Sequence, residues 1–188
     1  MGITFVFVTH DQGEALEMSD RLAVMDGGRV VQCGAPRDVY DRPEAEFVAD
    51  FLGVANLFDV DCKESVGPYR RVLLGSVPVQ ASSPAGFADG PGRAVVRPEA
   101  VRLADVGESG EGRLPGLVER TVFQGSTTLV HVRLVHGPSM QVLVTHAHGV
   151  EAPKEGSPGT VVLPPGALRV LTRSAPAASQ EEPVAKAG

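Results

Sequence analysis

The chain has 188 residues, of which 43% are hydrophobic, and a formal net charge of −6 at pH 7. Its 17 Lys and Arg residues form no visible basic stripe, which argues against a nucleic-acid partner held by phosphate neutralisation. Only 5% of the residues are aromatic and tryptophan is absent, so a core must consist mainly of Val, Leu and Ala.

The first apolar segment is Ile3–Val8 (ITFVFV), with β-branched and aromatic side chains at odd and even positions. This pattern predicts a strand buried on both faces, as in a parallel sheet. The run is too short for a signal-peptide core or a membrane span, and we expect a cytosolic chain. His10 follows the strand, and Glu14–Asp20 predicts the next helix. Ligands bind at this edge of open α/β sheets, so the position favours chemistry for His10; simple filling of the strand end is the alternative.

Three further elements are predicted before residue 53. They are a hairpin of Arg21–Met25 and Arg29–Gln32 with a Gly27-Gly28 turn, a helix that opens at Pro36 and is interrupted at Pro43, and a helix over Glu44–Phe51 that ends at Gly53. In the last helix, Phe47, Val48 and Phe51 should lie on one face. The two cysteines, Cys33 and Cys62, lack the spacing of a zinc site or disulfide framework, and we expect both to be reduced and partly buried.

From residue 56 to 172 the sequence changes to short apolar runs separated by Gly, Pro and Ser. This texture predicts a small antiparallel barrel or sandwich. Beyond Arg173 the segment is rich in Ala, Pro and Glu and should be disordered. The predicted organisation is therefore α+β, mostly β: a small α/β part over 1–53, a barrel over 54–172 and a tail over 173–188.

With these elements placed, VTHDQGEALEMSDRLAVMDGGRVVQCGAPRDVYDRPEAEFVADFLG resembles the end of the ATP-binding subunit of an ABC importer. The resemblance is to the group serving spermidine/putrescine, ferric iron, maltose and related solutes. The switch-histidine loop, the SDR-x-AVM-x-x-G-R strand pair, the GAP helix start, the Y-x-x-P break and the FVA-x-FLG helix occur in the family's order. The rest is similar to the family's C-terminal TOBE domain, a barrel related to the OB fold, with Val96–Glu99 matching VRPE and Val122–Gly125 a later strand.

The resemblance implies a role for three consecutive residues. His10 takes the switch-loop position, whose side chain reaches the γ-phosphate of ATP, while Asp11 supports the loop beside a partner subunit and Gln12 is structural. It also implies ATP and Mg²⁺ in the full subunit, a second ATPase subunit, membrane permease subunits and a cytoplasmic place on the membrane's inner face. An imidazole that donates a hydrogen bond where charge grows in the transition state fits this role. Gly13 departs from the family's Glu, at about 1 kcal/mol of local helix stability.

Three ATPase motifs are absent from the sequence. It holds no G-x-x-x-x-G-K-[ST] phosphate loop, no LSGGQ-like signature and no apolar strand ending in an Asp-Glu pair. In the family all three lie upstream of Ile3. We therefore expect the C-terminal part of a longer subunit, either a deliberate fragment or a gene with a lost or misassigned start, that does not hydrolyse ATP alone.

Other candidate sites are weaker. Arg97 and Glu99 could line an effector pocket in the barrel, and the alternative is a surface turn fixed by Pro98. His146 and His148, with His131 and His136, suggest a metal site only superficially, because no third ligand has a recognisable spacing, and we expect no metal. The GSTT run from Gly125 to Thr128 is interpreted as a strand bulge rather than a phosphate cradle. As a whole, the alternative function is an independent OB-like module that binds a small anion or solute.

Overall fold

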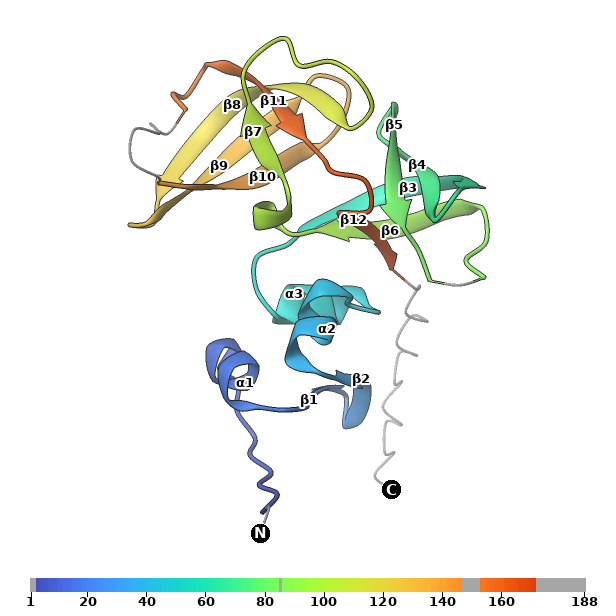
Figure 1. The fold of residues 1–188 in the computed structure, drawn as a ribbon, viewed down its shortest axis with the longest axis vertical. Coiled ribbons are helices and arrows are strands. Elements are labelled where there is room, and N and C mark those ends of the chain that lie inside the picture. The colour runs from blue at the N-terminus through green and yellow to red at the C-terminus, as the bar shows by residue number, and fades with distance from the viewer. Residues whose placement is uncertain (1–2, 85, 147–152, 172–188) are drawn as a thin grey trace, which may run out of the picture.

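The computed structural model describes residues 3–84, 86–146 and 153–171 (Figure 1). Among the described residues, the three α-helices lie in the first third of the chain, and most of the regular structure after it consists of strands. This confirms the α+β, mostly β prediction. The predicted disordered tail and His148 lie outside the described residues, and the domain boundaries at 53/54 and 172/173 stay predictions.

The predicted strand Ile3–Val8 is wrong for this chain. Residues 3–9 have no regular structure, and Ile3, Phe5, Val6 and Val8 are between 75% and 97% exposed. A strand patterned for burial needs neighbours on both edges, and no strand among the described residues pairs with this segment. Helix α1 (Gln12–Met18) then begins two residues earlier than predicted, because the Asp11 side chain caps it.

The predicted hairpin and the two following helices are present. Strands β1 (Leu22–Asp26) and β2 (Arg29–Gly34) pair antiparallel around Gly27 and Gly28, which have φ values of 54° and 76°. Two positive φ values at the centre of a two-residue loop match the twist of the strands. Helix α2 (Pro36–Asp41) has proline in its first turn, and α3 (Glu46–Phe51) follows the break at Pro43. These elements pack around a buried apolar cluster, which consists of Ala15, Leu22, Val24, Val39, Ala45, Val48 and Leu52.

The three residues predicted on one face of α3 differ in burial. Val48 is buried and Phe51 packs against the same apolar cluster. Phe47 is 39% exposed and stacks on Phe51 with ring centroids 6.0 Å apart. Ala49 is also buried, in a small cluster with Val95 and Leu171 of the first barrel.

The first barrel is closed and consists of five strands. These are β3 (Asn56–Val66), β4 (Tyr69–Leu74), β5 (Val77–Ser82), β6 (Gly90–Val96) and the final strand β12 (Leu168–Leu171), in the order β12-β5-β4-β3-β6. Strand β12 pairs parallel with β5 and antiparallel with β6, which closes the ring.

The second sheet has five strands in the order β10-β9-β8-β11-β7. They are β7 (Arg102–Ala104), β8 (Arg113–Phe123), β9 (Thr127–Leu134), β10 (Ser139–Thr145) and β11 (Pro158–Val162), preceded by the 3-10 helix η1 (Pro98–Ala100). Gly125 and Ser126 form the loop between β8 and β9, so the expected bulge at GSTT is wrong. The irregularity in this pair lies instead between Val118 and Arg120.

The two β units exchange a strand. Strand β7 directly follows β6 of the first barrel but pairs in the second sheet, whereas β12 follows β11 of the second sheet but closes the first barrel (Figure 1). One continuous apolar cluster runs through both units, from Phe58 and Leu74 to Leu114 and Val142. The OB-like β-barrel prediction is confirmed, and the structure adds that the region contains two interlocked units rather than one.

Candidate functional site

The loop before α1, Thr9–Gln12, is fixed by its own hydrogen bonds. The Glu14 backbone N–H donates to Asp11 Oδ1 at 3.0 Å, and the Asp11 backbone N–H donates to Thr9 Oγ1 at 3.0 Å. Thr9 Oγ1 in turn donates to Glu14 Oε2 at 2.9 Å. This is a capping-box arrangement in which the threonine hydroxyl replaces one backbone donor. Although the segment before it has no regular structure, the loop keeps a defined shape through these hydrogen bonds.

His10 is exposed at the middle of this loop. The two residues after it differ in place: Asp11 is the N-cap of α1, while Gln12 is the first residue of α1 and is half-buried. The Gln12 Oε1 atom lies 3.8 Å from the position that a Cβ atom on Gly53 would take. The three predicted residues, His10, Asp11 and Gln12, thus lie at the start of α1, and the exposed imidazole of His10 is accessible to a group from another chain or a ligand.

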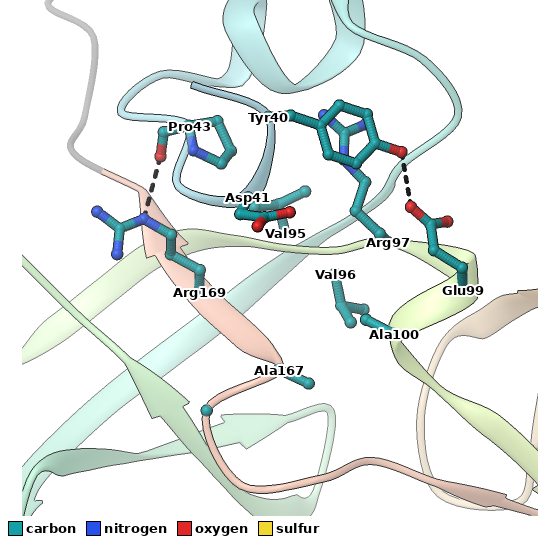
Figure 2. A pocket seen from close by; sticks show the side chains of 11 residues that line it. Tyr40, Asp41, Pro43, Val95, Val96, Arg97, Glu99, Ala100, Ala167 and Arg169 are labelled. Atoms are coloured by element: carbon teal, nitrogen blue, oxygen red, sulfur yellow. Dashed lines mark hydrogen bonds between the residues drawn. The ribbon is translucent and has the colours of Figure 1, made fainter. Parts of the chain in front are cut away.

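Arg97 and Glu99 lie at a second place, where α2 meets the first barrel. A cavity of about 240 Å³ opens there, and its lining includes Tyr40, Asp41, Arg97, Glu99 and Arg169. Figure 2 shows the Tyr40 ring stacked over the Arg97 guanidinium, with the ring's hydroxyl turned toward Glu99. We call this space the junction pocket.

The Arg97 side chain is only 7% exposed and is held mainly by backbone oxygen atoms. Its Nη1 donates to the carbonyl oxygen atoms of Ala49 at 2.9 Å, Gly53 at 3.1 Å and Val54 at 3.3 Å. The guanidinium carbon lies 4.3 Å from the Tyr40 ring centroid. The positive charge of Arg97 near these carbonyl groups also interacts favourably with the negative, C-terminal end of the α3 dipole. Burial lowers the pKa of Arg97, and nearby Tyr40 and Glu99 oppose that shift.

Tyr40 and Glu99 form the outer edge of the junction pocket. The Tyr40 hydroxyl donates to Glu99 Oε1 at 2.6 Å. Burial and this hydrogen bond to a carboxylate raise the pKa of Tyr40 to about 12. Sequence reasoning missed Tyr40 and Arg169 because the pocket is assembled from segments far apart in the chain. The Y-x-x-P break supplied a signal for Tyr40 only as a helix end.

The surface-turn alternative for Arg97 is wrong, because both Arg97 and Pro98 are buried. An effector pocket at these residues stays a prediction. Several polar atoms of the pocket already have partners. Glu99 accepts a hydrogen bond from Tyr40, Arg97 Nη1 donates to the Ala49 carbonyl oxygen, and Arg169 Nε donates to the Pro43 carbonyl oxygen at 3.2 Å (Figure 2). Arg97 Nε and Nη2, in contrast, are buried without a hydrogen-bond partner among the described residues.

The remaining candidates are simpler. Among the described residues, no group of three His, Cys, Asp or Glu side chains could hold a metal ion. His146 Nε2 instead lies 2.8 Å from Thr128 Oγ1. Cys62 is buried, and desolvation raises its thiol pKa, whereas Cys33 is exposed, contrary to prediction.

In the part of the chain that the structure describes, no helix has the length and apolar character to cross a bilayer.

Comparisons with known proteins agree with this arrangement. Residues 94–171 match the family model described as TOBE domain. The chain is 42% identical over 143 residues to the spermidine/putrescine import ATP-binding protein PotA of Mesorhizobium japonicum, covering 75% of this chain and 38% of that protein. The corresponding protein of Pseudomonas aeruginosa is 43% identical over 153 residues, and that of Ruegeria pomeroyi 46% over 138 residues, covering 42% and 36% of those proteins. The chain thus spans about two fifths of the length of these curated relatives.

A solved structure shares the β architecture. The cytoplasmic molybdate-binding protein ModG, with molybdate bound, superposes with a TM-score of 0.50 at 20% sequence identity, covering 63% of this chain and 96% of that chain. At this identity the likeness shows the fold alone. The TOBE match and the 42–46% identity to the PotA proteins over most of this chain support the C-terminal, TOBE-containing part of an ABC importer ATP-binding subunit.

Proposed function

We propose that the chain is the C-terminal regulatory part of the ATP-binding subunit of an importer for polyamines, with His10 acting in ATP hydrolysis once the subunit is complete. The carrying observation is the capped Thr9–Gln12 loop, which presents His10 to an outside group. The polyamine class is favoured because several relatives at 42% to 46% identity are named for spermidine/putrescine import.

In the complete subunit His10 would donate a hydrogen bond to the γ-phosphate of ATP. Bound ATP and Mg²⁺ supply the phosphoryl group and the charge neutralisation. The imidazole contact strengthens as negative charge develops in the transition state, so it favours hydrolysis more than binding. Asp11 keeps the loop in shape as the α1 N-cap, and the half-buried Gln12 lies beside Gly53.

The residues present do not suffice to hold ATP by themselves. His10 offers one hydrogen bond to a charged group, about 1.5–3 kcal/mol, whereas millimolar affinity already needs about 4 kcal/mol. The phosphate-loop glycines and lysine that hold the other oxygen atoms have no counterpart in the sequence. ATP binding therefore requires the upstream half of the ATPase domain as a partner.

Assembly extends the proposal to further partners. A second ATPase subunit would face the Thr9–Gln12 loop, and permease subunits would place the complex on the cytoplasmic face of the membrane. The unpaired segment Ile3–Val8 supports an upstream partner, because its exposed apolar side chains are patterned for a sheet.

The decisive experiment compares the chain as given with a subunit completed by an upstream ATPase half. Calorimetry should detect no micromolar ATP binding by the chain alone. In the completed subunit, His10→Ala should lower phosphate release by about 100-fold or more, as removal of one transition-state hydrogen bond does, while nucleotide binding is largely kept. A fully active His10→Ala subunit, or micromolar binding by the chain alone, would contradict the assignment.

The second candidate function is an OB-like module for a small anion. The junction pocket favours it to the extent that two arginines, Arg97 and Arg169, line about 240 Å³, and ModG binds molybdate on a similar fold. Titration of the chain with molybdate, sulfate and phosphate separates the two functions. Saturable binding that Arg169→Ala abolishes would favour the module, whereas no binding of any of the three favours the importer role.

A further inference from the structure

The segment Gly53–Asn56, which we call the linker, joins α3 to the first barrel and is held from both sides. Arg97 Nη1 donates to the carbonyl oxygen atoms of Gly53 and Val54. At the other end, Asn56 Nδ2 donates to the Gln141 carbonyl oxygen at 2.8 Å, and the Gln141 N–H donates to Asn56 Oδ1 at 2.7 Å. Arg97 directly follows β6 of the first barrel, and Gln141 belongs to β10 of the second sheet. The linker is therefore hydrogen-bonded to both β units.

The linker also faces the helix that follows the switch loop. Gln12 Oε1 lies 3.8 Å from the Cβ position on Gly53, whose φ of 123° disfavours any side chain there. Ala15 of α1, Val48 of α3 and Leu52 belong to one buried cluster. Because these groups are packed together, a displacement of the linker should shift Gln12 and Ala15, which lie about one helical turn from His10.

We infer that Arg97 is a positioning residue that couples the β units to the Thr9–Gln12 loop through the linker. Its Nη1 donates to the carbonyl oxygen atoms of Ala49 in α3 and of Gly53 and Val54, the first two linker residues. The charged and titratable groups around it are Tyr40 and Asp41 of α2, Asp50 of α3 and Glu99 of η1. The consequence for ATP hydrolysis rests on the proposed function, whereas the coupling itself concerns this chain alone.

Arg70 provides a matched control within the first barrel. It is 8% exposed and, like Arg97, stabilises backbone carbonyls through its guanidinium, donating to Lys63 and Phe87 as well as to Asp89. It also stacks on an aromatic ring, that of Phe87. Its partners all lie in the first barrel and the loops between its strands, so its loss tests burial of an arginine without the path to α1.

The experiment is amide hydrogen exchange, read by NMR on the full chain without nucleotide. Arg97→Met should speed exchange in α1 and at the end of α3 by roughly tenfold relative to Arg70→Met, because one clamp on the linker is lost. Arg97→Lys should restore part of the protection, since an ammonium group still bonds carbonyl oxygen atoms but lacks the planar fork. In a Gln12→Ala background, the effect of Arg97→Met on α1 should largely disappear, because the path is already interrupted.

Equal acceleration of α1 by Arg97→Met and Arg70→Met would overturn the coupling, as would an undiminished effect of Arg97→Met in the Gln12→Ala background. If Arg97→Met fails to fold by circular dichroism, the same comparison is made between Arg97→Lys and Arg70→Lys, and the same difference in α1 is required. No step uses ATP, so failure of the hydrolytic role of His10 leaves this result unchanged.

Discussion

The N-terminal tract Ile3–Val8 and the strands of the first barrel both carry apolar side chains, but only those of the barrel are buried. The tract is exposed and unpaired, whereas β3, β6 and β12 bury nearly all of their inward side chains. The difference is the presence of neighbours on both edges. A hydrophobic pattern specifies burial, but hydrogen-bonding partners for the backbone decide whether a strand forms.

The same comparison explains why the β region holds together as one body. Each β unit takes its fifth strand from a segment that is continuous with the other unit, so neither completes its set of strands without the other. The helices are joined to this body through Arg97 and through Arg93, whose guanidinium binds Glu46 of α3 and Asp59 of β3.

Removal of β12 should have the largest effect. Truncation after Leu163 deletes Leu168, Val170 and Leu171, which are fully buried, at about 1.5–3 kcal/mol each, a total comparable to the whole stability of a domain. We expect both β units to lose their cooperative unfolding transition, measured by far-ultraviolet circular dichroism. Truncation after residue 173 is the control and should leave the transition unchanged. A stable second sheet without β12 would show that the strand exchange does not join the units.

The two cysteines report on the two regions separately. Cys33 is exposed in β2 and Cys62 is buried in β3, with its thiol pKa raised by desolvation. Labelling by a thiol reagent should be at least about a thousandfold slower at Cys62, because the barrel must open with a free energy of about 4 kcal/mol or more. Single-thiol variants Cys33→Ser and Cys62→Ser assign the phases. Comparable rates would mean that the barrel is not a closed unit.

Leu52→Ala tests whether the helices share the stability of the barrel. Leu52 is fully buried between α1 and α3, and we expect a loss of about 2–5 kcal/mol. Urea unfolding should show a single transition with a lower midpoint, because the helices and the β units unfold together. Val106→Ala, at an exposed position, serves as the control, with a change within about 0.5 kcal/mol. A separate early transition in Leu52→Ala would divide the molecule into independent parts.

The smallest effect concerns the Tyr40–Glu99 hydrogen bond at the junction pocket. Tyr40 has its pKa raised from 10.0 to about 12 in the folded chain, so its contribution is complete below pH 10 and is lost as the pH rises toward 12. Tyr40→Phe should lower the melting temperature by about 2–4 °C at pH 8, in line with about 1 kcal/mol. This difference should shrink between pH 10 and pH 12. A difference that is constant over this range would mean that the hydroxyl does not stabilise the junction.

Local patterns in the sequence predicted the elements that depend on nearby residues. The Gly27-Gly28 hairpin and the start of α2 at Pro36 are examples, because turn chemistry is local, whereas the cap at Asp11 was not predicted and α1 begins two residues earlier than expected. The resemblance to ABC subunits located His10. The strand exchange and the contribution of Tyr40 and Arg169 to the junction pocket could not be predicted, since both depend on contacts between segments far apart in the chain. Arg97 and Glu99 were candidates for a pocket, but the surface turn was the alternative because Pro98 dominates the local pattern.

Native-state hydrogen exchange of the unmodified chain, read amide by amide by NMR, tests most directly whether the helices and the two β units form one body with an unpaired N-terminal tract. Residues 3–9 should exchange at the rate of an unfolded chain, whereas α3, the linker and β6 should share one high level of protection. Protection across Ile3–Val8, or α3 exchanging far faster than β6, would contradict this description.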